Sequence, residues 1–279
     1  VDVKGGVVRS TLNMLVSQRN IHNETGYRVG VDATLTDSVV KARFFPKNPI
    51  IGYRKWSVND SNYVSLNYKR REMLADLQLQ TDSSRVSLMS NSLDHTGKSD
   101  ILLKIDNLKI EEWLKFFPFA PEVSGSLSAN MGVAYDGKNI WGDGTASLKN
   151  FVYERQRVGD IDLSANLSVD PSTSSTNLKA DVDLDGSKVA FAYGSLNDST
   201  KKNPFDVSLK LDRFPLSKAT PFIPGNLVWL RGYLNGDLTV TGSMSKPIYN
   251  GYVVPDSANI YVPRYGSQLR LTETKIPVD

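Results

Sequence analysis

Residues 161–169 read Ile-Asp-Leu-Ser-Ala-Asn-Leu-Ser-Val, with an apolar side chain at every odd position. Successive side chains of a β-strand point to opposite faces, so this order predicts a strand with one apolar and one polar face. The alternation recurs along the chain in residues 27–35, 64–68, 127–133, 178–184, 207–211 and 234–240. A chain built from such segments is predicted to form an all-β fold.

Short turn signals stand between these segments. They are Asp136-Gly137, Asp170-Pro171, Asp185-Gly186 and Asn235-Gly236. Turns at intervals of roughly 8–12 residues are typical of an antiparallel meander, in which each strand pairs with the next. The predicted architecture is an antiparallel meander whose sheet has one apolar and one polar face.

One stretch of sequence returns after an offset of 106 residues. Residues 207–214, Val-Ser-Leu-Lys-Leu-Asp-Arg-Phe, echo residues 101–108, Ile-Leu-Leu-Lys-Ile-Asp-Asn-Leu. Each copy later reaches a Gly-x-Leu-x start, at Gly125 and Gly232. A fixed period in a strand-rich chain favours a stacked architecture. We therefore expect residues 1–279 to form one continuous region, with repeat units 1–105 (partial), 106–211 and 212–279 (incomplete).

Two segments break the alternation just before these Gly-x-Leu-x starts. Residues 110–117 place apolar side chains at i, i+3, i+4 and i+7 and precede Pro118, which predicts a short amphipathic helix. Residues 216–222 form a weaker copy that contains Pro221. We expect both to pack on an open end or edge of the apolar face, as junctions between units. The junction candidates are Trp113, Leu114, Phe117 and Phe222.

Composition and motifs argue against several classes of function. The net charge is +3, from 33 basic and 30 acidic residues, and the dense basic run at residues 68–71 is interpreted as a solvated turn. No nucleic-acid partner is therefore expected. The two histidines, His22 and His95, stand in polar, turn-like surroundings, and no phosphate-binding or nucleophile motif occurs. We expect neither catalysis nor a cofactor.

Residues 181–186, Asp-Val-Asp-Leu-Asp-Gly, match the opening of a calcium-binding loop. Such a loop needs a bidentate glutamate at its twelfth position, and here that position is Ala192. We interpret the carboxylates as the wet face of a strand and expect no metal site. No cysteine is present to form a disulfide or a thiolate site. No apolar run reaches the ~18–20 residues that span a bilayer.

Three passages together resemble the TamB family of AsmA-like envelope proteins. Residues 45–49, Phe-Pro-Lys-Asn-Pro, precede residues 53–59, Tyr-Arg-Lys-Trp-Ser-Val-Asn, and are similar to one family passage. Residues 232–247 follow the family line Gly-x-Leu-x-Gly-x-Leu-x-Val-x-Gly-x-x-x-x-Pro. Tyr153 with residues 158–163, Val-Gly-Asp-Ile-Asp-Leu, is similar to a family hairpin. The likeness covers most of residues 27–279, and we expect the chain to be a fragment of a longer protein.

The resemblance implies an elongated, curved antiparallel β-sheet, a U-shaped "β-taco" trough that is apolar inside and polar outside. Such a trough would cross the periplasm and conduct phospholipids between the inner and outer membranes of a diderm bacterium. It also implies a parent protein that is anchored in the inner membrane and has an Omp85-type outer-membrane partner. The expected contacts for acyl chains are Ile161, Leu163, Leu167, Val169, Leu178, Val182, Leu184, Leu209, Leu211, Leu234, Leu238 and Val240.

Two other hypotheses remain open on the sequence. A scaffold or chaperone for outer-membrane protein assembly would offer sheet edges to unfolded strands. Lysine, proline or bulges at those edges would argue against it. A surface stalk built from β-sandwich repeats would have a dry, fully packed interior in two closed domains.

Overall fold

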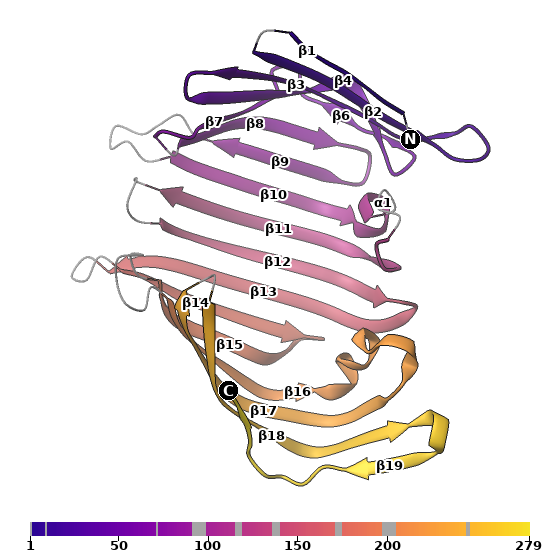
Figure 1. Ribbon diagram of the computed structural model, residues 1–279, viewed down its shortest axis with the longest axis vertical. Coiled ribbons are helices and arrows are strands. Elements are labelled where there is room, and N and C mark those ends of the chain that lie inside the picture. The colour runs from indigo at the N-terminus through magenta and orange to yellow at the C-terminus, as the bar shows by residue number, and fades with distance from the viewer. Residues whose placement is uncertain are drawn as a thin grey trace. The chain divides into compact units, whose positions relative to one another are not determined.

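A computed structural model describes residues 2–8, 10–70, 72–90, 99–114, 119–135, 140–170, 175–196, 205–243 and 246–279 (Figure 1). The chain is nearly all β, with 76% of residues in strands and 7% in helical turns. The predicted fold class, an open antiparallel β-sheet, is confirmed. Contacts divide the chain into two compact units, Val1–Lys138 and Asn139–Asp279, and this boundary falls inside the second predicted repeat unit.

Unit 1 is a meander whose main strands pair antiparallel in the order β1, β2, β3, β4, β7, β8, β9, β10, β11. The short strand β5 pairs with β4, and the short strand β6 pairs with β8. The elements are β1 Asp2–Val8, β2 Thr11–Arg19, β3 Thr25–Thr36, β4 Val39–Ile51, β5 Arg54–Lys55, β6 Ser57–Val58, β7 Tyr63–Asn67, β8 Glu72–Gln80, β9 Arg85–Ser90, β10 Ser99–Lys109, α1 Ile110–Leu114 and β11 Val123–Tyr135.

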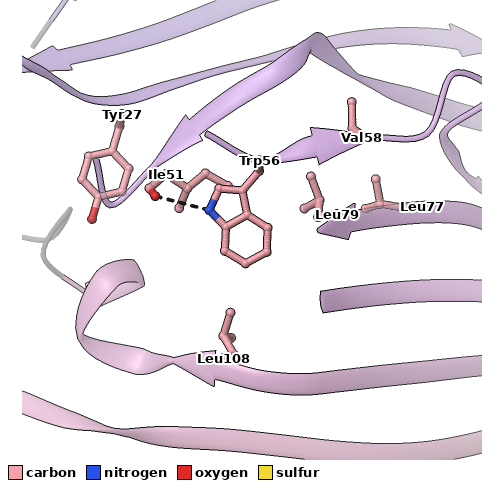
Figure 2. Packing of buried hydrophobic residues seen from close by; sticks show 7 residues of the cluster. All are labelled: Tyr27, Ile51, Trp56, Val58, Leu77, Leu79 and Leu108. Carbon is pink, nitrogen blue, oxygen red and sulfur yellow. Dashed lines mark hydrogen bonds between the residues drawn. The ribbon is translucent and has the colours of Figure 1, made fainter. Parts of the chain in front are cut away.

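The core of unit 1 forms around Trp56, which lies between β5 and β6 and is 1% exposed (Figure 2). Its indole Nε1 donates a hydrogen bond to the carbonyl of Ile51 at 3.3 Å. Its ring meets that of Trp113 edge-on, with centroids 5.7 Å apart. The buried cluster joins residues far apart in sequence: Tyr27, Ile51, Trp56, Val58, Leu77, Leu79 and Leu108. The segment between β4 and β7 therefore fills one end of the apolar face of unit 1.

Unit 2 is a second meander, in which β12 to β18 pair antiparallel in chain order (Figure 1). The short strands β19 and β20 both pair with β18. The elements are β12 Ile140–Tyr153, β13 Gln156–Asp170, β14 Ser175–Leu184, β15 Ser187–Leu196, β16 Phe205–Pro215, the 3₁₀ turns η1 Leu216–Lys218, η2 Thr220–Phe222 and η3 Pro224–Asn226, β17 Trp229–Ser243, β18 Lys246–Val262, η4 Pro263–Tyr265, β19 Ser267–Arg270 and β20 Ile276–Val278.

The 106-residue echo coincides with β-bulges. Asn107 in unit 1 and Arg213 in unit 2 hold equivalent places in the two copies, and both have a positive φ, 51° and 46°. The strand register shifts at each of them. A side chain of the next strand satisfies each bulged N–H: Ser128 Oγ at 3.1 Å in the first copy and Asn235 Oδ1 at 2.8 Å in the second. A bulge bends its strand and increases the local twist, so the repeat marks matching bends.

This geometry corrects one predicted turn. Asn235-Gly236 was predicted to end a strand, but both residues lie inside β17. The asparagine amide oxygen caps the bulge of β16, and Gly236 stands directly opposite Leu211. An Asn-Gly pair often forms the two-residue turn of a hairpin. Here the backbone of the pair stays extended, because β17 pairs with β16 on one side and with β18 on the other.

The predicted helices and turns are found in shorter or different forms. The helix of residues 110–117 is α1, Ile110–Leu114, and its weaker copy is replaced by the 3₁₀ turns η1 and η2. Pro221 in the copy disfavours a continuous helix. The turn at Asp185-Gly186 is present between β14 and β15. Outside the described residues lie Phe117, His95, Asp136-Gly137 and Pro171.

An ion pair ties η1 to the β14–β15 turn within unit 2. Lys218 Nζ lies 2.5 Å from Asp185 Oδ2, and the other oxygen of this carboxylate accepts the Asp160 N–H at 2.8 Å. These two interactions hold the pKa of Asp185 below its ordinary value. Gly159 leaves room for the pair, because a Cβ there would lie 2.4 Å from Asp185 Oδ1. The ion pair thereby ties η1 to the end of the β14–β15 hairpin.

This ion pair predicts a dependence of stability on pH. The lowered pKa of Asp185 means that its contribution is present above the unfolded-state pKa, near 3.9, and is lost as pH falls through the lower folded value. Asp185→Asn should therefore lose less stability than the parent chain between pH 5 and pH 3 in urea unfolding. The exposed Asp212→Asn is the matched control, and an equal acid response of Asp185→Asn and the parent chain would contradict the prediction.

Candidate functional site

One face of unit 2 carries continuous rows of apolar residues that run across the strands. Directly opposed residues of neighbouring strands project from the same face of a sheet, so the register defines each row. The first row is Ala146, Leu163, Val182, Ala190, Leu211, Gly236, Val253 and Ile276. The second row is Gly144, Ala165, Ala180, Ala192, Leu209, Leu238, Gly251 and Val278. We call this surface the apolar face of unit 2.

A third row lies beside the second, two residues further along each strand. It consists of Gly142, Leu167, Leu178, Gly194, Val207, Val240 and Tyr249. The rows extend over β12 to β18 without a charged residue. The five strands from β13 to β17 alone span about 19 Å, because paired strands lie ~4.8 Å apart.

The structure places the twelve sequence-predicted contact residues on this one face. Eight stand in the three rows, and Ile161 and Leu184 oppose each other two residues before the first row on β13. Val169 follows the third row on β13, opposite Thr176. Leu234 precedes Gly236 by two positions on β17 and pairs with Phe214. The predicted residues therefore mark this face on four strands, β13, β14, β16 and β17.

Most of these side chains are only partly buried. Leu184, beside the hairpin end, is 7% exposed, whereas Leu163 in the first row is 37% exposed. The other ten lie between fully buried and exposed. Among the described residues, the non-strand elements that pack on the sheet of this unit include η1 against β17 and η2 against β13. The apolar face thus presents partly accessible aliphatic surface rather than a sealed core.

The opposite face of the same strands is polar and ion-paired. Lys149 Nζ lies 2.9 Å from Asp162, and Lys188 Nζ lies 2.7 Å from Asp181. Hydrogen bonds from Ser147 and Lys149 lower the pKa of Asp162, and the hydrogen bond to Asp181 raises the pKa of Lys188. Two carboxylates of the calcium-like motif are thus engaged with lysines, Asp181 with Lys188 and Asp185 with Lys218. Among the described residues, no group of three or more potential ligands is placed to hold a metal ion.

Sequence reasoning missed the small residues of the apolar face. On β15, Ala190 and Ala192 belong to the rows, while Phe191 and Tyr193 project from the polar face and stack with centroids 5.4 Å apart. Lys210 approaches the ring of Phe191 at 6.0 Å. Hydrophobicity alone would predict that Phe191 and Tyr193 lie on the apolar face, since their side chains are larger than those of the two alanines. The register of β15 with β16 was the signal needed, and the sequence does not display it.

The junction candidates lie in two separate packing environments. In unit 1, Trp113 packs against Trp56, and Leu114 is partly buried beside it on α1. In unit 2, Phe222 lies against Tyr153, with ring centroids 4.7 Å apart, and is 50% exposed. Trp113 thus packs in the core of unit 1, whereas Phe222 packs beside β12 in unit 2 and stays half exposed.

No family model, no curated protein and no solved structure matches the chain. Within the described parts of the chain, no helix is both long and apolar enough to cross a bilayer. The functional argument therefore starts from the apolar face of unit 2.

Proposed function

We propose that the apolar face of unit 2 binds phospholipid acyl chains, in a periplasmic TamB-like protein that conducts lipids between the two membranes of a diderm bacterium. The observation that supports the proposal is the set of apolar rows whose aliphatic side chains remain partly accessible, such as Leu163 at 37% exposure. The resemblance to the TamB family supplies the cellular setting.

The energetics favour a continuous surface over a single deep pocket. Moving an acyl chain of about 16 carbons through water exposes ~0.8 kcal/mol per methylene, roughly 12 kcal/mol in all. A row of similar aliphatic residues on successive strands replaces that barrier by small steps of about 4.8 Å. The rows contain no charged group that would hold a chain at one place, so sliding along them should be easy.

Strand capture, the function of an assembly chaperone, is less well supported. Residues 246–250 of β18 pair with β17 on one side, and no described strand pairs with their other edge. This edge begins with Lys246 and Pro247, and the short strand β20 contains Pro277. Lysine and proline are the residues that protect free edges against added strands.

The proposal is tested by placing charges on the apolar face. Leu163→Asp with Leu238→Asp should reduce binding of a fluorescent phospholipid at least 100-fold, because a chain seated on the rows would desolvate two carboxylates. Binding is measured by fluorescence titration, and copurified phospholipid by mass spectrometry. We expect the parent chain to carry diacyl phospholipid and the double variant to carry none.

The matched control changes the opposite face of the same strands. Asn166→Asp with Thr239→Asp adds the same charge on β13 and β17, where both residues lie in the polar rows. This control should bind lipid as the parent chain does. If the parent chain neither copurifies with phospholipid nor takes it up, or if both double variants lose binding equally, the proposal is wrong.

A further inference from the structure

The strands β17, β18 and β19 lie side by side in unit 2 (Figure 1). Their pairing places a cluster of arginine and aromatic residues on one face. The register gives two parallel rows, Trp229–Tyr261–Gln268 and Arg231–Asn259–Arg270. Trp229 and Arg231 are two positions apart on β17, so both rows project from the same face. We call these six residues the arginine–aromatic patch.

The aromatic part of the patch is accessible and ordered by side-chain packing. Trp229 is 45% exposed, and its ring lies 5.6 Å from that of Tyr261. Beyond the end of β18, Tyr265 in η4 is 72% exposed and has the Arg264 guanidinium 5.8 Å from its ring centroid. A group of large, solvent-exposed aromatic side chains at one end of a sheet indicates an interaction surface.

The charge of the patch is left unbalanced. Arg231 and Arg270 are exposed, and within the described part of the chain neither forms an ion pair. The nearby carboxylate of Asp256 is engaged by Arg213 at 2.9 Å, and that guanidinium also covers the ring of Tyr233 at 4.2 Å. Asn259 Oδ1 accepts the Gln268 amide at 3.2 Å, which orients the polar residues between the two arginines.

We infer that the arginine–aromatic patch docks on the surface of a bilayer that contains anionic phospholipids. Guanidinium groups bind phosphate through paired N–H donors, and tryptophan and tyrosine prefer the headgroup level of a membrane. Two unpaired arginines beside a Trp–Tyr pair combine both preferences on one face. This contact with a membrane surface is separate from the binding of acyl chains to the apolar face, and it requires none of the residues in the rows.

Cosedimentation with vesicles tests the inference. The parent chain should bind vesicles with 30% phosphatidylglycerol in phosphatidylcholine, and should bind pure phosphatidylcholine vesicles much more weakly. Arg231→Gln with Arg270→Gln should weaken binding to the anionic vesicles ~30-fold, because each arginine near such a surface strengthens binding roughly fivefold. Brominated lipid should quench the tryptophan fluorescence of the parent chain more strongly than that of the Trp229→Phe variant. This difference would place the Trp229 indole at the headgroups.

The control removes the same charge elsewhere. Arg28→Gln with Arg85→Gln lowers the net charge equally from exposed positions of unit 1 and should leave vesicle binding within about twofold. Equal losses in the two double variants, or equal binding to both kinds of vesicle, would overturn the inference. The inference would also be overturned if the chain bound polyglutamate through Arg231 and Arg270 but did not bind vesicles. The aspartate variants of the apolar face should still bind vesicles, which distinguishes failure of one proposal from failure of the other.

Discussion

Trp56→Ala is expected to lower the free energy of unfolding of unit 1 by about 3–5 kcal/mol, the usual cost of truncating a buried tryptophan. Trp56 is 1% exposed and lies at the centre of the cluster that joins β3, β4, β6, β8 and β10. Alanine would leave a cavity and would remove the edge-on contact with Trp113. Urea unfolding followed by tryptophan fluorescence, together with hydrogen exchange of β8 and β10, measures the loss.

The control for this prediction is Trp229→Ala. Trp229 is 45% exposed, so its removal should cost less than about 1 kcal/mol. If the two alanine variants lose the same stability, Trp56 does not organise the core of unit 1. A double-mutant cycle with Trp113→Ala should give a coupling of about 0.5–1.5 kcal/mol for the pair of rings.

Gly232→Ala is expected to destabilise unit 2 by about 3 kcal/mol or more, because two separate costs add at this position. Gly232 has a φ of 88°, which disfavours any residue with a Cβ. A Cβ there would also lie 2.3 Å from the carbonyl oxygen of Ser257 and 2.7 Å from the Cα of Ala258. Both atoms belong to the backbone of β18, so the bulge at Ser257 would have to move.

Gly186→Ala separates the two costs. Gly186 has a φ of 80°, and a Cβ there would have no atom within 4 Å, so only the backbone conformation is penalised. This variant should lose about 1 kcal/mol in the same unfolding experiment. Equal losses for Gly232→Ala and Gly186→Ala would show that β18 relaxes without cost. Hydrogen exchange across β17 and β18 would reveal such a change in pairing.

The alternation of the sequence predicted which residues share a face, and the reason is local. A strand turns its side chains to opposite sides every second residue, so Leu163 and Leu167 must lie together whatever the neighbouring strands do. The same reasoning assigned Leu238 and Val240 to one face. It failed for Asn235-Gly236, because the preference of this pair for a turn is weaker than the pairing of β17 with strands on both sides.

Features that depend on register were not visible in the sequence. The turn between β14 and β15 and the bulge at Val182/Asp183 set how β15 meets its neighbours. They bring Ala190 and Ala192 into the apolar rows and turn Phe191 outward. The arginine–aromatic patch depends in the same way on the pairing of β18 with β19 across η4, which brings Arg270 into the row of Arg231.

The sequence by itself determined the all-β class and the one-sided strands, since both follow from the order of neighbouring residues. Tertiary structure alone decided that Trp56 fills one end of the apolar face of unit 1, while Leu163 and its row in unit 2 stay partly accessible. The reason is physical. Burial depends on which distant segments cover a face, and residues as far apart as Tyr27 and Leu108 meet only when the whole meander of unit 1 has formed.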